Sequence, residues 1–196
     1  VDFCAGAGGK TLALAAMMQN TGVLYACDIS EGRLERLKPR LARGGAYNVQ
    51  SFAIRDEQDP VLKKLAGTAD AVLVDAPCSG TGTLRRNPDI KWRSIDLEML
   101  TGIQASILEA ASQLVKPGGR LIYATCSLLQ EENDAITAAF LSNHPEFEVI
   151  PAIEILARQG VSLPEGLRED GALRLLTHRH GTDAFYALAM RRRISA

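Results

Sequence analysis

Residues 2–11 read Asp-Phe-Cys-Ala-Gly-Ala-Gly-Gly-Lys-Thr, a stretch that leads from a predicted strand into a predicted helix. Its start predicts the end of a buried strand at residues 1–4, and its end begins a segment of helical spacing at residues 9–19. Glycines between a strand and a helix let a ligand approach the backbone, because glycine has no Cβ and accepts positive φ. The N-terminus of the helix adds unpaired N–H groups for a polar ligand.

The rest of the chain alternates apolar runs with segments at helical spacing. This alternation is typical of an α/β sandwich, a largely parallel sheet with helices on both faces. A stretch broken by prolines and glycines, residues 151–183, is expected to form irregular surface structure near the functional site. Further strands are predicted at 22–28, 48–54, 69–75, 119–125, 147–150 and 184–190, and further helices at 31–43, 96–115 and 131–143.

The bulk properties predict one domain over residues 1–196. The chain is 46% hydrophobic, and its net charge of -1 provides no overall attraction to nucleic acid or to a membrane surface. It has no apolar stretch near the roughly 20 residues of a membrane span and opens with no signal segment, so we expect a cytoplasmic protein. Val1 to Phe3 read as the last part of a strand, which favours a longer protein whose upstream region is absent here.

Four cysteines are far apart in the sequence, and none forms a C-x-x-C pair. This spacing favours neither a metal site nor a disulfide framework, so we expect four reduced thiols and no metal. Cys27 lies within an apolar run and is predicted to be a small core residue.

Acidic residues follow the second and third predicted strands. Asp28 stands where a carboxylate accepts hydrogen bonds from both hydroxyls of a ribose, although it could instead cap the next helix. Asp56 is placed to accept from an adenine amino group, or it is an exposed loop acid. NAD and S-adenosylmethionine both fit this arrangement. The dinucleotide fingerprint G-x-G-x-x-G is not met, which favours S-adenosylmethionine.

Two cysteine motifs follow predicted strands, Asp-Ala-Pro-Cys-Ser-Gly-Thr-Gly at 75–82 and Ala-Thr-Cys-Ser at 124–127. A thiolate at a strand end can attack an electron-poor ring carbon in the ligand crevice. Cys78 could also be only a turn residue and Cys126 only a core thiol. The residues alone leave the two nearly even as the nucleophile.

These motifs resemble those of the RNA cytosine-5 methyltransferases, and in particular the bacterial Sun/Fmu group of the small-subunit ribosomal RNA methyltransferase B type. The resemblance covers nearly the whole chain, with 151–180 least matched. The chain departs from the family at Gly6 and Ala7 in the turn and at Ala184 in the motif near the end. The resembling segments are 2–11, 75–82, 87–92, 124–127, 130–133 and 183–186.

The resemblance implies a three-layer, Rossmann-like class I methyltransferase fold, with a mostly parallel seven-stranded sheet and an antiparallel C-terminal strand. It implies methylation of cytosine C5 in RNA, with Cys126 as the nucleophile at C6 and Cys78 in product release. Asp75 is expected at the N3 edge of the cytosine and beside the methionine end of the cofactor, with Lys10 supporting the ring or lowering a thiol pKa. The implied cofactor contacts are Cys4, Ala5, Gly6, Ala7, Gly8, Gly9, Lys10, Asp28, Arg33, Asp56 and Asp75.

The implied RNA partner should present a single-stranded or extruded cytosine, ribosomal RNA being the expected case. Trp92 could stack on a base or be a core anchor, and the basic residues Arg85, Arg86, Lys91 and Arg93 could contact phosphates or form a solvated face. Rival interpretations are an amino-group methyltransferase, a nucleotide-dependent dehydrogenase and a non-catalytic RNA-binding module of the same fold.

Overall fold

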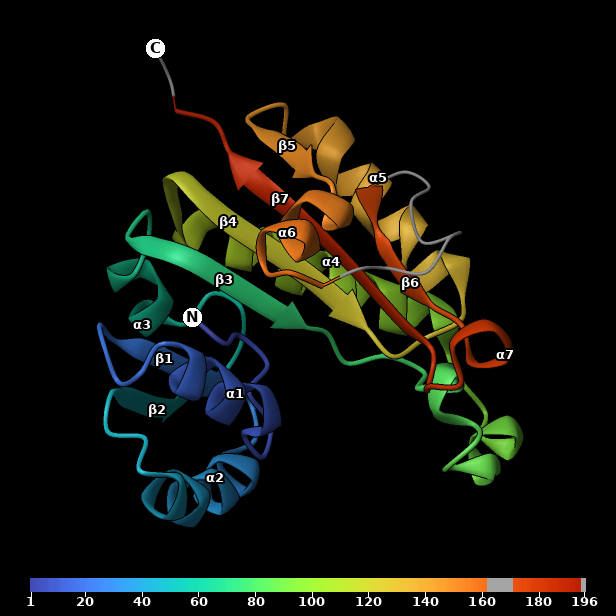
Figure 1. Cartoon of the computed structure of the whole chain (residues 1–196), viewed down its shortest axis with the longest axis horizontal. Helices are drawn as coiled ribbons and strands as arrows, with labels where there is room; N and C mark the ends of the chain where they lie inside the picture. Colours follow the sequence, from blue (N-terminus) through green and yellow to red (C-terminus); the bar gives the residue numbers. More distant parts are fainter. Residues whose placement is uncertain (162–170, 195–196) are drawn as a thin grey trace.

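A computed structural model describes residues 1–161 and 171–194 of the chain. The elements build an α/β fold, as predicted (Figure 1). The strands are β1 (Leu24–Asp28), β2 (Val49–Ala53), β3 (Ala69–Asp75), β4 (Val115–Thr125), β5 (Phe147–Ile150), β6 (Leu173–Leu175) and β7 (Phe185–Arg192). The α-helices are α1 (Gly9–Met17), α2 (Glu31–Gly44), α3 (Pro60–Lys64), α4 (Leu97–Leu114), α5 (Asp134–Asn143), α6 (Ala152–Arg158) and α7 (Thr177–His180). The 3-10 turns near the ends of β3 and β4 are η1 (Thr81–Thr83), η2 (Pro88–Trp92) and η3 (Gln130–Glu132).

The N-terminal residues join two groups of strands into one surface. β1 pairs with β2, and β3, β4, β7 and β5 follow one another in the second group. Asp2 forms parallel bridges to Ala26 of β1 and Leu73 of β3, so residues 1–3 fill the position between them. The prediction of a full strand at 1–4 was wrong, because only the two isolated bridges of Asp2 form.

The direction of the strands agrees with the prediction of a mostly parallel sheet. β1 and β2 run parallel, and so do β3 and β4. β7 is antiparallel to β4, β5 and β6, so the reversed C-terminal strand is confirmed. β6 was not predicted; it pairs with residues 185–187 of β7, beside the stretch that pairs with β5.

Helices cover the sheet through apolar side chains. α4 contacts β3, β4 and α5, and Figure 1 shows α4 running behind β3 and β4. Buried residues of these elements form the main core, including Val72 and Val74 of β3, Leu108 of α4 and Tyr123 of β4. α2 packs on β1 and β2 through a second cluster around Leu37. Cys27 is fully buried, as predicted.

Three further predicted segments differ from the structure. The helix predicted at 131–143 is divided into η3 and α5, because Asn133 between them has non-helical backbone angles. The Asn133 side chain accepts a hydrogen bond from the Thr125 hydroxyl and donates one to the Ser127 carbonyl. The strand predicted at 119–125 begins at Val115, with a register shift that accommodates the loop around Gly118. The prediction of irregular structure at 151–183 was wrong for the described part of this stretch, which contains α6, β6 and α7. Residues 162–170 lie outside the described residues.

None of the helices in the described part of the chain combines the length and the apolar character that a membrane span requires.

Candidate active site

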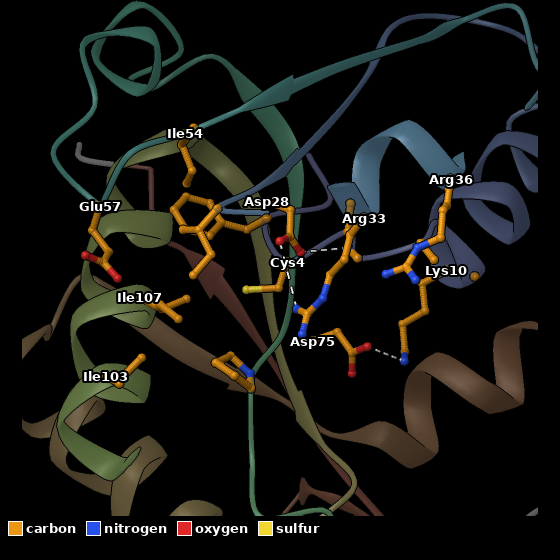
Figure 2. A pocket seen from close by; sticks show the side chains of 17 residues that line it. Cys4, Lys10, Asp28, Arg33, Arg36, Ile54, Glu57, Asp75, Ile103 and Ile107 are labelled. Carbon is orange, nitrogen blue, oxygen red and sulfur yellow. Dashed lines mark hydrogen bonds and ion pairs between the residues drawn. The ribbon is translucent and has the colours of Figure 1, made fainter. Parts of the chain in front are cut away.

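A cavity of about 610 Å³ opens at the carboxyl ends of β1 and β3 (Figure 2). The glycine-rich turn after residue 3 forms one wall, and Ile103 and Ile107 of α4 form part of the opposite wall. The carboxyl ends of parallel strands meet at one edge of a sheet, which is where α/β proteins bind ligands.

Two glycines shape the turn in different ways. Gly6 has φ of +55° and its amide donates to Asp28 Oδ2 at 2.8 Å. Gly8 has φ of +84°, and a Cβ added there would stand 2.0 Å from Cδ1 of Leu37. Gly8 therefore allows α2 to pack closely on the turn, whereas Gly6 faces the cavity.

Asp28 ends β1 and lies almost buried against the turn, with 5% of its surface exposed. Its Oδ1 accepts from the Ser30 amide at 2.8 Å, and the Arg33 guanidinium stands 3.9 Å from the same oxygen. The N-cap of α2 is Ser30, whose hydroxyl accepts from the Arg33 amide. Asp28 therefore organises the turn and lines the cavity, and the alternative in which it serves as the helix cap does not hold.

An ion pair stands at the other side of the cavity. Lys10, in the first turn of α1, binds Oδ2 of Asp75 at 2.5 Å (Figure 2). The Lys10 ammonium also lies 5.5 Å from the centre of the Phe185 ring. Both members of the pair remain partly exposed, so a ligand can still reach them.

The two cysteine motifs come together beside this ion pair. Asp75 and Ala124 are register partners in β3 and β4, so the loops that follow these strands are neighbours. The sulfurs of Cys78 and Cys126 are 3.4 Å apart. A hydrogen bond from the Cys78 thiol lowers the pKa of Cys126 to about 7, and the nearby Lys10 ammonium adds to this effect. The same hydrogen bond and burial raise the pKa of Cys78.

Cys4 lines the cavity, whereas neither Cys78 nor Cys126 is among the residues that line it, and Cys4 differs chemically from this pair. Burial raises the pKa of its thiol far above the usual range, so Cys4 stays protonated at neutral pH. Of the three thiols at the site, Cys126 is the one that most readily becomes a thiolate.

Gly82 lets the two cysteine loops approach each other. Its amide donates to the Cys126 carbonyl at 2.9 Å, and its own carbonyl accepts from the Ala184 amide at 2.9 Å. A Cβ at this position would stand 2.7 Å from the carbonyl oxygens of both Ala184 and Cys126. Only glycine fits between them.

Most of the residues predicted for the cofactor line one cavity, but two do not. Gly8 is turned toward Leu37, as described above. Asp56 is exposed and its Oδ1 accepts from the Gln58 amide at 2.9 Å. Its neighbour Glu57 lines the cavity instead. The predicted residues that line the cavity are Cys4, Ala5, Gly6, Ala7, Gly9, Lys10, Asp28, Arg33 and Asp75.

Sequence reasoning missed several apolar residues of the cavity and two charged ones, Arg36 and Glu57. Ile103 and Ile107 are four residues apart on α4, a spacing that equally indicates an ordinary core face. Arg36 follows Arg33 by one helical turn, which is the only signal that it shares the same side of α2. The missed residues are Phe3, Ile29, Arg36, Ile54, Glu57, Pro77, Ile103 and Ile107.

The basic segment after the first cysteine motif protrudes from the end of the sheet, around residues 81–92 in Figure 1. Trp92 is 79% exposed, so it is not a core anchor, and the Lys91 ammonium lies 4.9 Å from its ring centre. Arg85 and Arg86 both pair with Asp183, which precedes β7.

Among the described residues, no group of three or more histidine, cysteine, aspartate or glutamate side chains is placed to hold a metal ion.

Comparison with known proteins identifies this arrangement. A sequence model described as 16S rRNA methyltransferase RsmB/F matches residues 1–191. The chain belongs to the RsmB/F methyltransferase family. The resemblance found in the motifs is thereby confirmed at the level of the family.

Relatives and solved structures agree with this membership. The chain is 36% identical over 204 residues to the probable ribosomal RNA small subunit methyltransferase B of Bacillus subtilis, covering 98% of this chain and 43% of that protein. It is 40% identical over 174 residues to ribosomal RNA small subunit methyltransferase B of Yersinia pseudotuberculosis, covering 87% and 40%. The crystal structure of NSun6 from Pyrococcus horikoshii with SFG superposes with a TM-score of 0.79 at 28% identity, covering 99% of this chain and 47% of that chain. The chain thus spans less than half of each of these RsmB/F and NSun6 proteins.

Proposed function

We propose that the protein methylates C5 of a cytosine in RNA, using S-adenosylmethionine as the methyl donor and Cys126 as a covalent nucleophile. The observation that carries this proposal is the Cys126 sulfur, 3.4 Å from the Cys78 sulfur and influenced by the Lys10 and Asp75 side chains that line the cavity. The family description, 16S rRNA methyltransferase, supports ribosomal RNA as the substrate.

The cavity suits the proposed methyl donor. Its glycine turn gives backbone access, the Asp28 carboxylate stands where a ribose hydroxyl would bind, and isoleucines offer an apolar surface to an adenine. Glu57 is better placed than Asp56 to meet the adenine amino group. SFG, the ligand in the NSun6 structure, is an analogue of S-adenosylmethionine, which favours this donor over NAD. When bound, S-adenosylmethionine supplies an electrophilic methyl group.

The residues of the chain then activate the base. The Cys126 thiolate adds to C6, and the electron pair of the C5–C6 double bond moves so that C5 becomes nucleophilic. Asp75 holds the N3 edge of the ring during this step. After methylation, a base removes the C5 proton, the C6–sulfur bond breaks and Cys126 leaves as a thiolate. Cys78 assists this release from its position beside the departing sulfur.

The target base has to leave a stacked helix before the partly buried Cys126 thiol can reach C6. The exposed Trp92 provides a face for stacking a neighbouring base, and the Lys91 ammonium lies next to its ring. Arg85 and Arg86 bind Asp183, so their charge is partly neutralised and they act more in holding this segment than in binding phosphate. We place the reaction in the cytoplasm, where ribosomal RNA is found.

Two variants of the full-length protein test the proposal. Cys126→Ala is expected to abolish methyl transfer to RNA, because no other thiol at the site readily becomes a thiolate. Cys78→Ala is expected to accumulate an RNA adduct that survives a denaturing gel, because release is impaired. Full activity in Cys126→Ala would refute the assigned role. RNA binding without any methyl transfer by the wild type would favour a non-catalytic module, and NADH binding in place of S-adenosylmethionine would favour a dehydrogenase.

A further inference from the structure

Each of the two cysteines Cys78 and Cys126 is followed by a serine that is buried and does not line the cavity. Ser79 and Ser127 are 9% and 3% exposed, and their hydroxyl oxygens are 3.1 Å apart. They belong to loops that follow different strands, yet both reach the same carboxylate. That carboxylate is Glu132 in η3, which is fully buried.

Four hydrogen bonds converge on the Glu132 carboxylate. Its Oε1 accepts from the Ser79 amide at 2.7 Å and from the Gln104 side chain at 2.9 Å. Its Oε2 accepts from the Ser79 hydroxyl at 2.5 Å and from the Ser127 hydroxyl. The Gln104 amide also donates to the carbonyl of Pro77, the residue before Cys78, at 2.9 Å. The Glu132 carboxylate therefore connects the two loops through the residues that directly follow the cysteines, Ser79 and Ser127.

The strand that leads to Cys126 holds η3 in place. The Tyr123 hydroxyl donates to the Glu132 carbonyl at 2.7 Å, and the Thr125 hydroxyl donates to Oδ1 of Asn133 at 2.5 Å. The carboxylate is thus fixed to β4, and the loop of Cys78 is fixed to the carboxylate.

A buried acid is a costly way to fill this space. A carboxylate loses its hydration on burial, and an apolar side chain of similar volume often stabilises a fold as well or better. An apolar side chain, however, cannot accept hydrogen bonds from two serines at once. Hydrogen bonds to a carboxylate are short and strong, so they restrict the two loops more closely than packing alone. The benefit of Glu132 therefore lies in the geometry of the cysteine loops.

We infer that Glu132 is a positioning residue for the reaction, one that sets the distance between the Cys78 and Cys126 sulfurs by binding Ser79 and Ser127. The inference rests on the proposed function, in which Cys126 is the nucleophile. If either serine is released, the sulfurs separate, and Cys126 loses the hydrogen bond that keeps its pKa low. The pKa of Cys126 then rises toward that of an ordinary thiol.

The direction in which the pKa of Cys126 changes distinguishes a positioning role of Glu132 from a purely electrostatic one. Were Glu132 only a negative charge near the thiol, Glu132→Gln would lower the pKa of Cys126, because a like charge disfavours the thiolate. The positioning role predicts a rise for Glu132→Gln. It also predicts a rise for Ser127→Ala, and a smaller rise for Ser79→Ala, because the Ser79 amide still donates to Oε1 of Glu132. Neither serine variant removes a charge.

The test uses these three variants in the full-length protein, with Ser142→Ala and Glu131→Gln as exposed controls of the same residue types. The pH dependence of iodoacetamide alkylation is measured without RNA, and peptide mass spectrometry follows Cys126. We expect a higher apparent pKa in the three variants and a loss of kcat of roughly 100-fold, the scale of a 1 Å misplacement, with KM for RNA unchanged. Both controls should match the wild type.

Variants that melt at a lower temperature but keep the wild-type pH profile and kcat would overturn the inference, because Glu132 would then only hold the fold. If Glu132→Gln fails to fold, the two serine variants decide. Failure of the proposed function is distinguishable, since it would be seen as methyl transfer by Cys126→Ala, whereas the alkylation profile needs no RNA and no turnover.

Discussion

Gly82→Ala should displace the nucleophile without removing any chemical group from the site. The φ of Gly82 is not among the positive values in the described chain, so alanine can adopt its backbone conformation. The obstacle is space, because the new Cβ would stand 2.7 Å from two backbone oxygens, those of Ala184 and Cys126. Neither oxygen belongs to a side chain that could rotate away.

The size of the displacement follows from these distances. Ordinary contact begins at 3.4 Å, so one or both oxygens must move by about 0.7 Å. One of them belongs to Cys126 itself, and a shift approaching 1 Å at a catalytic group costs up to roughly 100-fold in rate. We expect kcat to fall by about 10-fold to 100-fold, and the free energy of unfolding to fall by about 1–3 kcal/mol, the usual cost of overpacking.

The assay measures single-turnover methyl transfer to RNA together with urea unfolding of the same preparations. Gly102→Ala is the matched control, because Gly102 lies in α4 with no atom of the described chain within 4 Å of the added Cβ. It should gain about 0.5–1 kcal/mol of stability from helix propensity and keep the wild-type rate. A wild-type rate in Gly82→Ala would refute the argument that this glycine sets the position of Cys126.

Three further predictions concern the turn, the fold and the thiol. Gly8→Ala should lower the free energy of unfolding by about 2–5 kcal/mol, because left-handed backbone strain adds to the collision with Leu37. Gly6→Ala should lower it by only about 1–2 kcal/mol, because backbone strain acts alone there. Equal urea midpoints for the two variants would contradict this. Burial alone would lower the pKa of His144, but the hydrogen bonds that its ring donates to Glu146 and Glu109 outweigh burial, and the net pKa is raised. The stabilisation by His144 is therefore full below its unfolded-state pKa of about 6.5, and it is lost as the pH rises through its folded-state pKa. The difference in the free energy of unfolding between wild type and His144→Gln should shrink when the pH is raised from 6 to 9. A difference that grows over this range would contradict the prediction. Alkylation of Cys126 should titrate with an apparent pKa near the value of about 7 given above, and a midpoint above pH 8.5 would contradict the hydrogen bond from Cys78.

Strand ends were the part of the site that sequence could predict. Asp28 and Asp75 each end an apolar run, and parallel strands bring such ends to one edge of the sheet. The proximity of Cys78 and Cys126 follows from the same rule, because their strands are neighbours. Asp56 follows a strand as well, but the chain turns after β2 so that Glu57 faces the cavity, and no residue pattern marks that turn.

Long-range polar contacts were beyond the reach of sequence patterns. Glu132 belongs to a run of acidic residues that would normally be exposed, and its burial depends on donors from three separate segments. The first strand failed for a related reason, because only residue 2 forms bridges to both neighbours. Local periodicity reports which face of an element is apolar, but it does not report which distant group meets that face.

The most direct test of the covalent mechanism compares two single variants incubated with RNA and S-adenosylmethionine and then denatured. Peptide mass spectrometry after nuclease digestion should find a cytidine-derived mass on the Cys126 peptide of Cys78→Ala and none in Cys126→Ala. An adduct formed by Cys126→Ala and absent from Cys78→Ala would transfer the nucleophile to Cys78 and contradict the account.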